Sequence, residues 1–184
     1  GESLRDRAQI LRKYNRKLSD ITRSKLQYLS HNRILSLHLD PLRPYLWIGT
    51  GGGGLNRLNL YSGKIQVFRP NPNRTNSLSG SIIRCITSDR GGGLWIGTEE
   101  GGLTMFDGTR FLQFRHNQDD STSLSSNHVR CIEQTGAGAV WIGTFDGGLN
   151  LFDRSTRTFT RYKHEESNPN SISSNTVFTM LSTH

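Results

Sequence analysis

The tetrapeptide Trp-Ile-Gly-Thr occurs three times, at Trp47–Thr50, Trp95–Thr98 and Trp141–Thr144, and a Gly-Gly pair follows each copy after two further residues. Successive copies lie 48 and 46 residues apart. A period in this range is typical of small sheets stacked side by side, because one such unit cannot bury both of its faces alone. The chain of 184 residues is therefore predicted to be a repeat protein.

Each repeat contains four short apolar runs separated by turn residues, which is the composition of a propeller blade. In the third copy the runs are 129–132, 140–143, 149–152 and 159–162, and the second copy matches them at 83–86, 94–97, 103–106 and 111–114. We expect blade 1 at 29–70, blade 2 at 71–116 and blade 3 at 117–164. Residues 165–184 are expected to form a connecting loop and the first strand, 176–181, of an incomplete fourth blade. The predicted fold class is all-β: a β-propeller fragment of about three four-stranded blades plus one extra strand, preceded by an N-terminal α-helix.

The first 28 residues have no repeat character. Leu4, Leu11 and Leu18 recur every seven residues, which predicts an amphipathic helix over about Ser3–Lys25. The helix could pack against the blades or form a short coiled coil. Residues 1–46 hold ten Lys/Arg and four Asp/Glu, a net charge of +6. No nucleic-acid-binding motif accompanies these cations, so we expect a solvated basic face and no nucleic-acid partner.

The repeated tryptophans and glycines are expected to be structural, because they recur at one strand position in every blade. They are Trp47, Trp95, Trp141, Gly49, Gly97 and Gly143. Cys85 and Cys131 also occupy equivalent positions, and stacked sheets lie about 10 Å apart, beyond the reach of a disulfide. Two free, buried thiols are therefore predicted. The sequence contains no signal peptide and no apolar run long enough to cross a membrane, so we expect a mature or excised soluble part.

The repeat resembles that of the two-component regulator propeller family. The resemblance rests on Leu124-Ser125-Ser126-Asn127-x-Val129, followed by Val140-Trp141-Ile142-Gly143-Thr144-x-x-Gly147-Gly148-Leu149, and on the matching segments of the other copies. It implies a periplasmic or extracellular sensing region of a membrane receptor, usually two large propellers ahead of a sandwich domain, a membrane span and a cytoplasmic histidine kinase or diguanylate cyclase. This chain would hold about a fifth of such a set of blades, so the resemblance also implies a piece of a longer receptor.

Catalytic, metal and cofactor motifs are lacking. The six histidines have no metal-ligand spacing, and the glycines of 51–54 are not followed by the Lys-Ser/Thr of a phosphate-binding loop. We therefore expect no catalytic residues, no metal and no cofactor, and no enzyme activity in this chain.

A ligand site is predicted at the hairpin tips that follow Trp-Ile-Gly-Thr, because these tips and the inter-blade loops emerge at one end of a propeller. Acidic, amide and aromatic side chains gather there, which suits a saccharide. The predicted ligand-binding residues are Glu99, Glu100, Phe145, Asp146, Asn117 and Asp119. Solvated hairpin tips are the simpler interpretation of the same residues.

Two functions remain open on this basis. The chain is either part of the ligand-sensing propeller of a bacterial two-component-type receptor, with an oligosaccharide as the expected ligand, or a scaffold that assembles with itself or with a protein partner. An incomplete ring leaves the faces of its terminal sheets exposed to solvent. Association would bury these faces, so the chain is expected not to be a monomer. Other copies of the chain, or the remaining blades of a parent propeller, would cover these faces.

Overall fold

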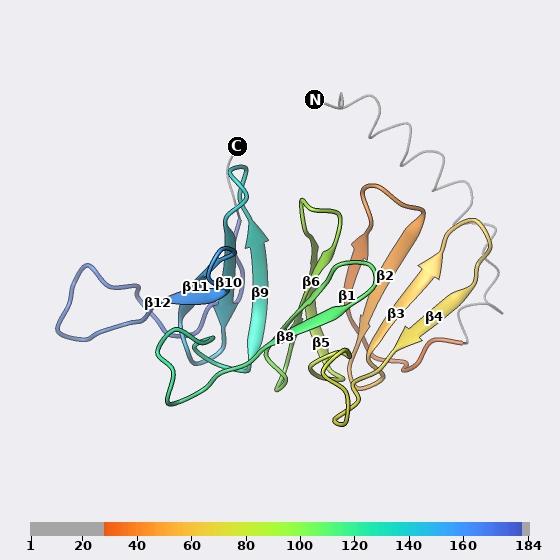
Figure 1. The fold of residues 1–184 in the computed structure, drawn as a ribbon. Coiled ribbons are helices and arrows are strands. Elements are labelled where there is room, and N and C mark those ends of the chain that lie inside the picture. Colours follow the sequence, from red (N-terminus) through yellow and green to blue (C-terminus); the bar gives the residue numbers. More distant parts are fainter. Residues whose placement is uncertain (1–27, 182–184) are drawn as a thin grey trace.

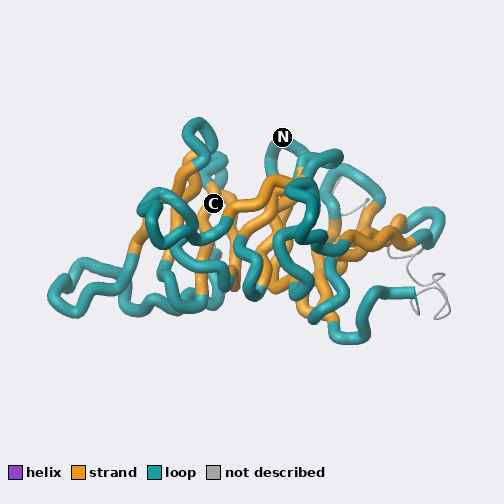
Figure 2. The backbone as a smooth tube through the Cα atoms, turned by 60° about the horizontal axis from the view of Figure 1, so that its bottom comes forward, coloured by secondary structure: helices purple, strands orange, loops and turns teal. Residues whose placement is uncertain are grey.

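The computed structural model describes residues 28–181, and in this part of the chain it contains strands and loops only (Figure 2). Twelve strands form three antiparallel sheets of four. The first sheet consists of β1 (Ile34–Leu39), β2 (Tyr45–Thr50), β3 (Leu55–Asn59) and β4 (Ile65–Phe68). The second consists of β5 (Ile83–Ser88), β6 (Leu94–Thr98), β7 (Leu103–Phe106) and β8 (Phe111–Phe114). The third consists of β9 (Val129–Gln134), β10 (Val140–Thr144), β11 (Leu149–Asp153) and β12 (Thr158–Tyr162).

The three sheets are propeller blades that stand side by side along one arc (Figure 1). Within each sheet the strands follow chain order, and the inner strands β1, β5 and β9 contact one another in turn. Two hydrophobic clusters fill the spaces between neighbouring blades, one around Trp47 and one around Trp95. The all-β fold and the three four-stranded units predicted from the sequence are therefore confirmed.

The repeated tryptophan of one blade packs against a phenylalanine of the next. The ring of Trp95 meets Phe152 edge-on at a centroid distance of 5.1 Å, and Trp47 meets Phe106 at 5.9 Å. Both tryptophans are completely buried. Trp141 has no such neighbour among the described residues and is only half-buried, because blade 3 is the last complete blade of the arc.

The threonine of the tetrapeptide and the Gly-Gly pair shape the hairpin between the second and third strands. In blade 2 the Thr98 hydroxyl donates to the Gly102 carbonyl at 2.9 Å and accepts from the Gly101 N–H at 2.9 Å. Gly102 has a φ of +81°, in the left-handed region that glycine adopts without a Cβ clash. Gly101 lies so close to Ser79 that a Cβ would be 2.2 Å from its carbonyl oxygen. These contacts explain why the motif recurs as a block.

The glycine of the tetrapeptide is where the inner strand of the next blade approaches. A Cβ on Gly97 would lie 2.5 Å from Val129 Cγ1 and 2.4 Å from Cys85 Sγ. The same contact recurs between Gly49 and Ile83, and again between Gly143 and Val177. The structural role predicted for these glycines thus has a physical reason, which is close contact between blades.

Two of the sequence-based expectations concern the ends of the chain. The predicted helix Ser3–Lys25 lies outside the described residues. The strand predicted over 176–181 is wrong, because these residues form no strand. The Val177 N–H does donate to the Thr144 carbonyl at 2.9 Å, as the start of an inner strand would. Within residues 28–181 no adjacent strand pairs the remaining backbone groups of this segment, and pairing is what defines a strand.

Both cysteines are free, as predicted, but they are only partly buried. Burial raises the pKa of the Cys131 thiol to about 11 and raises that of Cys85 further. Their Sγ atoms lie beside Gly143 and Gly97 of their own blades, where each fills the space that the missing Cβ leaves. Their role is therefore in packing.

At the opposite end from the hairpin tips, a buried carboxylate links blades 2 and 3. Asp89 follows β5 and accepts from Trp95 Nε1 at 2.9 Å, from the Gly91 N–H at 2.9 Å and from the guanidinium of Arg154. Burial alone would raise the pKa of Asp89, but these hydrogen bonds outweigh it and hold the pKa below its usual range. Trp47 donates to Asp40 in the same way in blade 1.

Candidate functional site

The hairpin tips after β2, β6 and β10 lie at one end of the arc together with the segments that lead into the next blade. Backbone hydrogen bonds join the two in every repeat: Gly54 to Ser81, Gly102 to Asn127 and Gly148 to Asn175, at 2.8 to 2.9 Å. We call this surface the hairpin-tip end. It is the end at which the sequence predicted a site.

A β-bulge precedes each tip on the inner strand. The register with the second strand slips between Ile34 and Ser36 in blade 1, between Ile83 and Cys85 in blade 2, and at the equivalent place in blade 3. The extra residue is Leu35, Arg84 or Arg130. Bulges re-aim side chains and are over-represented near functional sites. In blades 2 and 3 this bulge delivers an arginine.

The two arginines meet at Glu99, on the tip of the β6–β7 hairpin. Arg84 Nε donates to Glu99 Oε2, and Arg130 Nη2 lies 3.6 Å from Glu99 Oε1. The hydrogen bond from Arg84, assisted by the charges of both arginines, holds the pKa of Glu99 below its usual range even though burial opposes this. Glu99 is therefore an ionised bridge between two blades at neutral pH.

Phe145 and Asp146 lie on the next tip, beside the same arginine. The Arg130 guanidinium carbon lies 4.6 Å from the centroid of the Phe145 ring, a cation–π contact. Asp146 Oδ2 lies 3.8 Å from His128 Nδ1, and the Thr176 hydroxyl donates to the Phe145 carbonyl at 2.5 Å. The structure thus brings Glu99, Phe145 and Asp146 into one chain of neighbours around Arg130 and His128.

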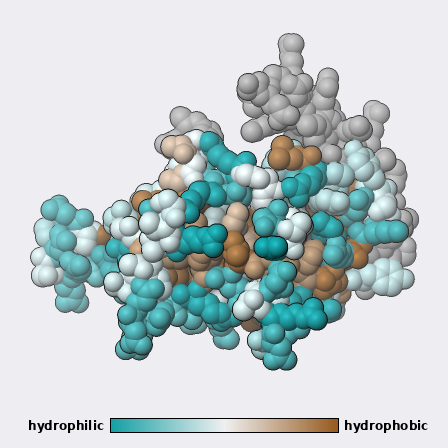
Figure 3. Space-filling view, viewed as in Figure 1, coloured by the Kyte–Doolittle hydropathy of each residue, from teal (hydrophilic) through white to brown (hydrophobic). Residues whose placement is uncertain are grey.

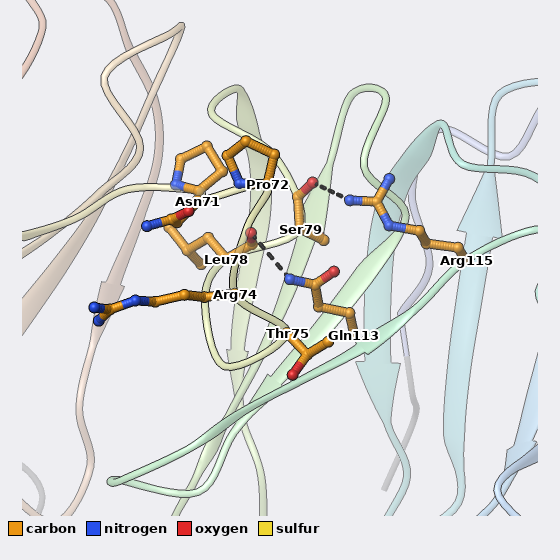
Figure 4. Close-up of a pocket in the computed structure, with 9 residues that line it drawn as sticks. Asn71, Pro72, Arg74, Thr75, Leu78, Ser79, Gln113 and Arg115 are labelled. Atoms are coloured by element: carbon orange, nitrogen blue, oxygen red, sulfur yellow. Dashed lines mark hydrogen bonds between the residues drawn. The ribbon is translucent and has the colours of Figure 1, made fainter.

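Two adjoining cavities lie between the β4–β5 loop and blade 2. The first, of about 380 Å³, is lined by residues of the 70–79 segment together with Gln113 and Arg115 (Figure 4). The second, of about 310 Å³, includes Glu99 and Glu100 in its wall. Pro70, Ser79 and Arg115 line both. Hydrogen bonds from Gln113 to the Leu78 carbonyl at 3.3 Å and from Arg115 to the Ser79 carbonyl at 2.7 Å fix the floor.

Asn117 and Asp119 lie in the β8–β9 loop, and their hydrogen bonds stay within it. The Asn117 N–H donates to Ser123 Oγ at 2.9 Å, and the Asp119 N–H donates to Asn117 Oδ1 at 3.1 Å. Within the described part of the chain, no hydrogen bond or ion pair joins them to Glu99 or Phe145. Their evident task is to shape the loop.

Sequence reasoning missed Arg84, Arg130, His128 and Arg115. A signal was present for the first two, because Ile83-Arg84-Cys85-Ile86 and Val129-Arg130-Cys131-Ile132 place an arginine at one repeat position inside an apolar run. A charged residue at that point indicates a side chain turned out of the blade interface. Nothing in the sequence indicates that both arginines would reach the same carboxylate.

Residues 28–181 contain no group of histidine, cysteine, aspartate and glutamate side chains suited to hold a metal. In the same range, no helix has the length and hydrophobicity that crossing a membrane requires. The features of the hairpin-tip end that could bind a ligand are therefore its charged side chains, the exposed ring of Phe145 and the two cavities.

The fold and the hairpin-tip end define an arc of β-propeller blades whose loops converge on one surface. Residues 77–100 and 123–146 match the family model of the two component regulator propeller. Blades 2 and 3 thus each carry this repeat, and the resemblance drawn from the sequence is confirmed. No curated protein sequence is significantly similar to the chain.

One solved structure has a similar fold. The chain is similar to the extracellular domain assigned to the hybrid two component system BT3049 from B. thetaiotaomicron, with a TM-score of 0.71 and 25% identity. The match covers 82% of this chain and 21% of that one, so the chain spans about a fifth of its relative's length. A second match, to the extracellular domain assigned to the hybrid system BT4673 of the same organism, has a TM-score of 0.43 and 19% identity, over 79% of this chain and 24% of that one.

Proposed function

We propose that the chain is part of the periplasmic or extracellular ligand-sensing propeller of a bacterial two-component-type receptor, and that it performs no chemistry itself. The observation that carries the proposal is the two component regulator propeller repeat in blades 2 and 3. The likeness to the extracellular domain of BT3049 supports the location. The output domain, a histidine kinase or diguanylate cyclase, would belong to other parts of the receptor.

The ligand is proposed to be an oligosaccharide that binds at the hairpin-tip end. Phe145 supports this, because 41% of the residue is exposed on a tip and a flat apolar ring can stack on a sugar. Glu100, beside Glu99 in the wall of the second cavity, supplies an acceptor for hydroxyl groups. Most of the molecular face visible in Figure 3, where the arc is seen from the side, is hydrophilic.

The test is a thermal-shift screen of the chain against neutral and acidic oligosaccharides of three to six units. A binding sugar raises the melting temperature, and the rise grows with the logarithm of the sugar concentration once this exceeds Kd. The Phe145→Ala variant should lose the shift, whereas Lys64→Ala, an exposed residue in the turn at the opposite end, should keep it. If no oligosaccharide shifts the melting temperature, the sugar-sensing proposal fails.

A second candidate function is assembly through the outer face of blade 3. Trp141 and Tyr162 are in contact on this face and are incompletely buried, and beside it Phe178 is 68% and Leu181 87% exposed. Apolar side chains in such numbers favour a partner surface, either another copy of the chain or further blades. Sedimentation equilibrium at micromolar concentration should give more than the mass of one 20.7 kDa chain. A single-chain mass with cooperative unfolding would contradict self-assembly.

A further inference from the structure

The arginines of blades 2 and 3 occupy a position that the fold does not require to be charged. Blade 1 has Leu35 at the same bulge, and the segment after blade 3 has Phe178 at the equivalent place. Glu99 likewise corresponds to Gly51 in blade 1 and Phe145 in blade 3. Because the other repeats fold without charged residues at these positions, Arg84, Arg130 and Glu99 are not needed for the blade fold. They form a charged cluster where blades 2 and 3 meet.

This cluster of three residues holds two positive charges and one negative charge. Arg84 and Arg130 share the single carboxylate of Glu99, and the separation of 3.6 Å from Arg130 is longer than a good hydrogen bond. Asp146 lies nearest to His128, with 3.8 Å between Oδ2 and Nδ1, and among the described residues no ion pair joins it to Arg84 or Arg130. Arg130 therefore interacts with Glu99 more weakly than Arg84 does. Its guanidinium can still donate hydrogen bonds to another acceptor.

Solvent reaches all three side chains. Their exposed fractions are 26% for Arg84, 20% for Arg130 and 23% for Glu99. A guanidinium that is partly shielded from water binds a carboxylate more strongly than a fully exposed one, and its planar fork matches two carboxylate oxygens at once. The Arg130 guanidinium lies over one face of the exposed Phe145 ring, 4.6 Å from its centroid, so a cationic fork and an apolar ring are direct neighbours.

We propose that this cluster is a subsite for the carboxylate of an acidic sugar. The inference rests on the proposed function and gives its ligand a class, an oligosaccharide that contains uronic acid. The sugar carboxylate pairs with Arg130. It also pairs with Arg84 once it has displaced Glu99, and the pyranose ring lies toward Phe145. Glu99 then acts as an internal competitor that occupies the arginines when no ligand is present, which sets the affinity and discriminates against weakly anionic ligands.

The experiment is isothermal titration calorimetry of the chain at low salt with trigalacturonate as the probe. Its fully methyl-esterified form serves as the uncharged match, and inorganic sulfate as the bare anion. The variants are Arg130→Gln, Glu99→Gln and, as a control of equal charge change at the opposite end, Lys64→Gln. Circular dichroism melting shows that each variant is folded.

Glu99→Gln should bind trigalacturonate about tenfold more tightly than the wild type, because the competing charge is gone. Arg130→Gln should weaken binding at least tenfold, and Lys64→Gln should leave it within about twofold, since charges at the far end are screened. The ester should bind weakly to every variant. Sulfate should bind far more weakly than trigalacturonate.

Three results would overturn the inference: equal affinity for acid and ester, no gain in Glu99→Gln, or sulfate as tight as the trisaccharide. A neutral oligosaccharide that shifts the melting temperature while trigalacturonate does not bind would remove the acidic subsite and leave the proposed sensing function standing. If Arg130→Gln melts early, the Glu99→Gln result decides, because this variant retains both arginine residues.

Discussion

Replacing Gly97 by alanine should destabilise the protein because the added methyl group enters the contact between two blades. The new Cβ would lie 2.4 Å from Cys85 Sγ and 2.5 Å from Val129 Cγ1, whereas non-bonded carbon atoms rest about 3.5–4.0 Å apart. At least one neighbour must move by roughly 1 Å. Cys85 lies on β5, which pairs with β6, and Val129 lies on β9, which pairs with β10, so neither neighbour can move away without straining a strand pair.

Overpacking of this kind costs about 1–3 kcal/mol, and we expect the upper half of this range because two blades resist the change. The assay is urea denaturation followed by tryptophan fluorescence, with the midpoint shifted and the slope unchanged. The matched control is Gly136→Ala, in the β9–β10 turn, where the nearest atom to a Cβ is Arg90 Nη2 at 3.9 Å. This control should change the free energy of unfolding by less than about 0.5 kcal/mol.

A second variant separates the two contacts. Cys85→Ala removes the Sγ atom, so the double variant with Gly97→Ala should recover part of the loss, with a coupling of about 0.5 kcal/mol or more. Equal unfolding free energies for Gly97→Ala and Gly136→Ala would refute the view that this glycine is needed for blade contact.

Three further measurements check other parts of the structure. The lowered pKa of Asp89 contributes stability above its unfolded pKa, so acid unfolding of the wild type should begin as pH falls below about 4, and Asp89→Asn should flatten this pH dependence. Because burial raises the pKa of Cys131 to about 11, iodoacetamide at pH 8 should label this thiol much faster in urea than in buffer, and equal rates would contradict the packing described. Trp95→Ala should cost about 3–5 kcal/mol in a denaturant titration, and Trp141→Ala less than half as much, because only Trp95 is fully buried; similar losses would argue that blade 3 is covered.

Much of the blade could be predicted because its determinants are local. The threonine and the Gly-Gly pair of each tip close their own hairpin within a few residues, so the same block gives the same turn wherever it occurs. The strand predicted over 176–181 was wrong for the complementary reason. Its residues have the pattern of an inner strand, but a strand exists only when a neighbour pairs with it.

The site was partly predictable. Position in the repeat placed Glu99, Phe145 and Asp146 at one end, because hairpin connectivity fixes which loops share a surface. It could not reveal that Arg84 and Arg130 reach the same carboxylate, since this depends on a bulge and on the distance between two blades. Position in the repeat also predicted Asn117 and Asp119 as ligand-binding residues alongside Glu99, although their hydrogen bonds stay within their own loop.

The amino-acid order by itself determined the all-β architecture, the four strands of each blade and the turn at every tip, because these follow from period, alternation and backbone conformational preference over short stretches. Only the tertiary structure decided which distant side chains meet: Trp95 against Phe152, Val129 against Gly97, and the guanidinium groups of Arg84 and Arg130 around Glu99. Such contacts join residues more than 14 positions apart, and their geometry depends on how whole sheets pack, which no local pattern encodes.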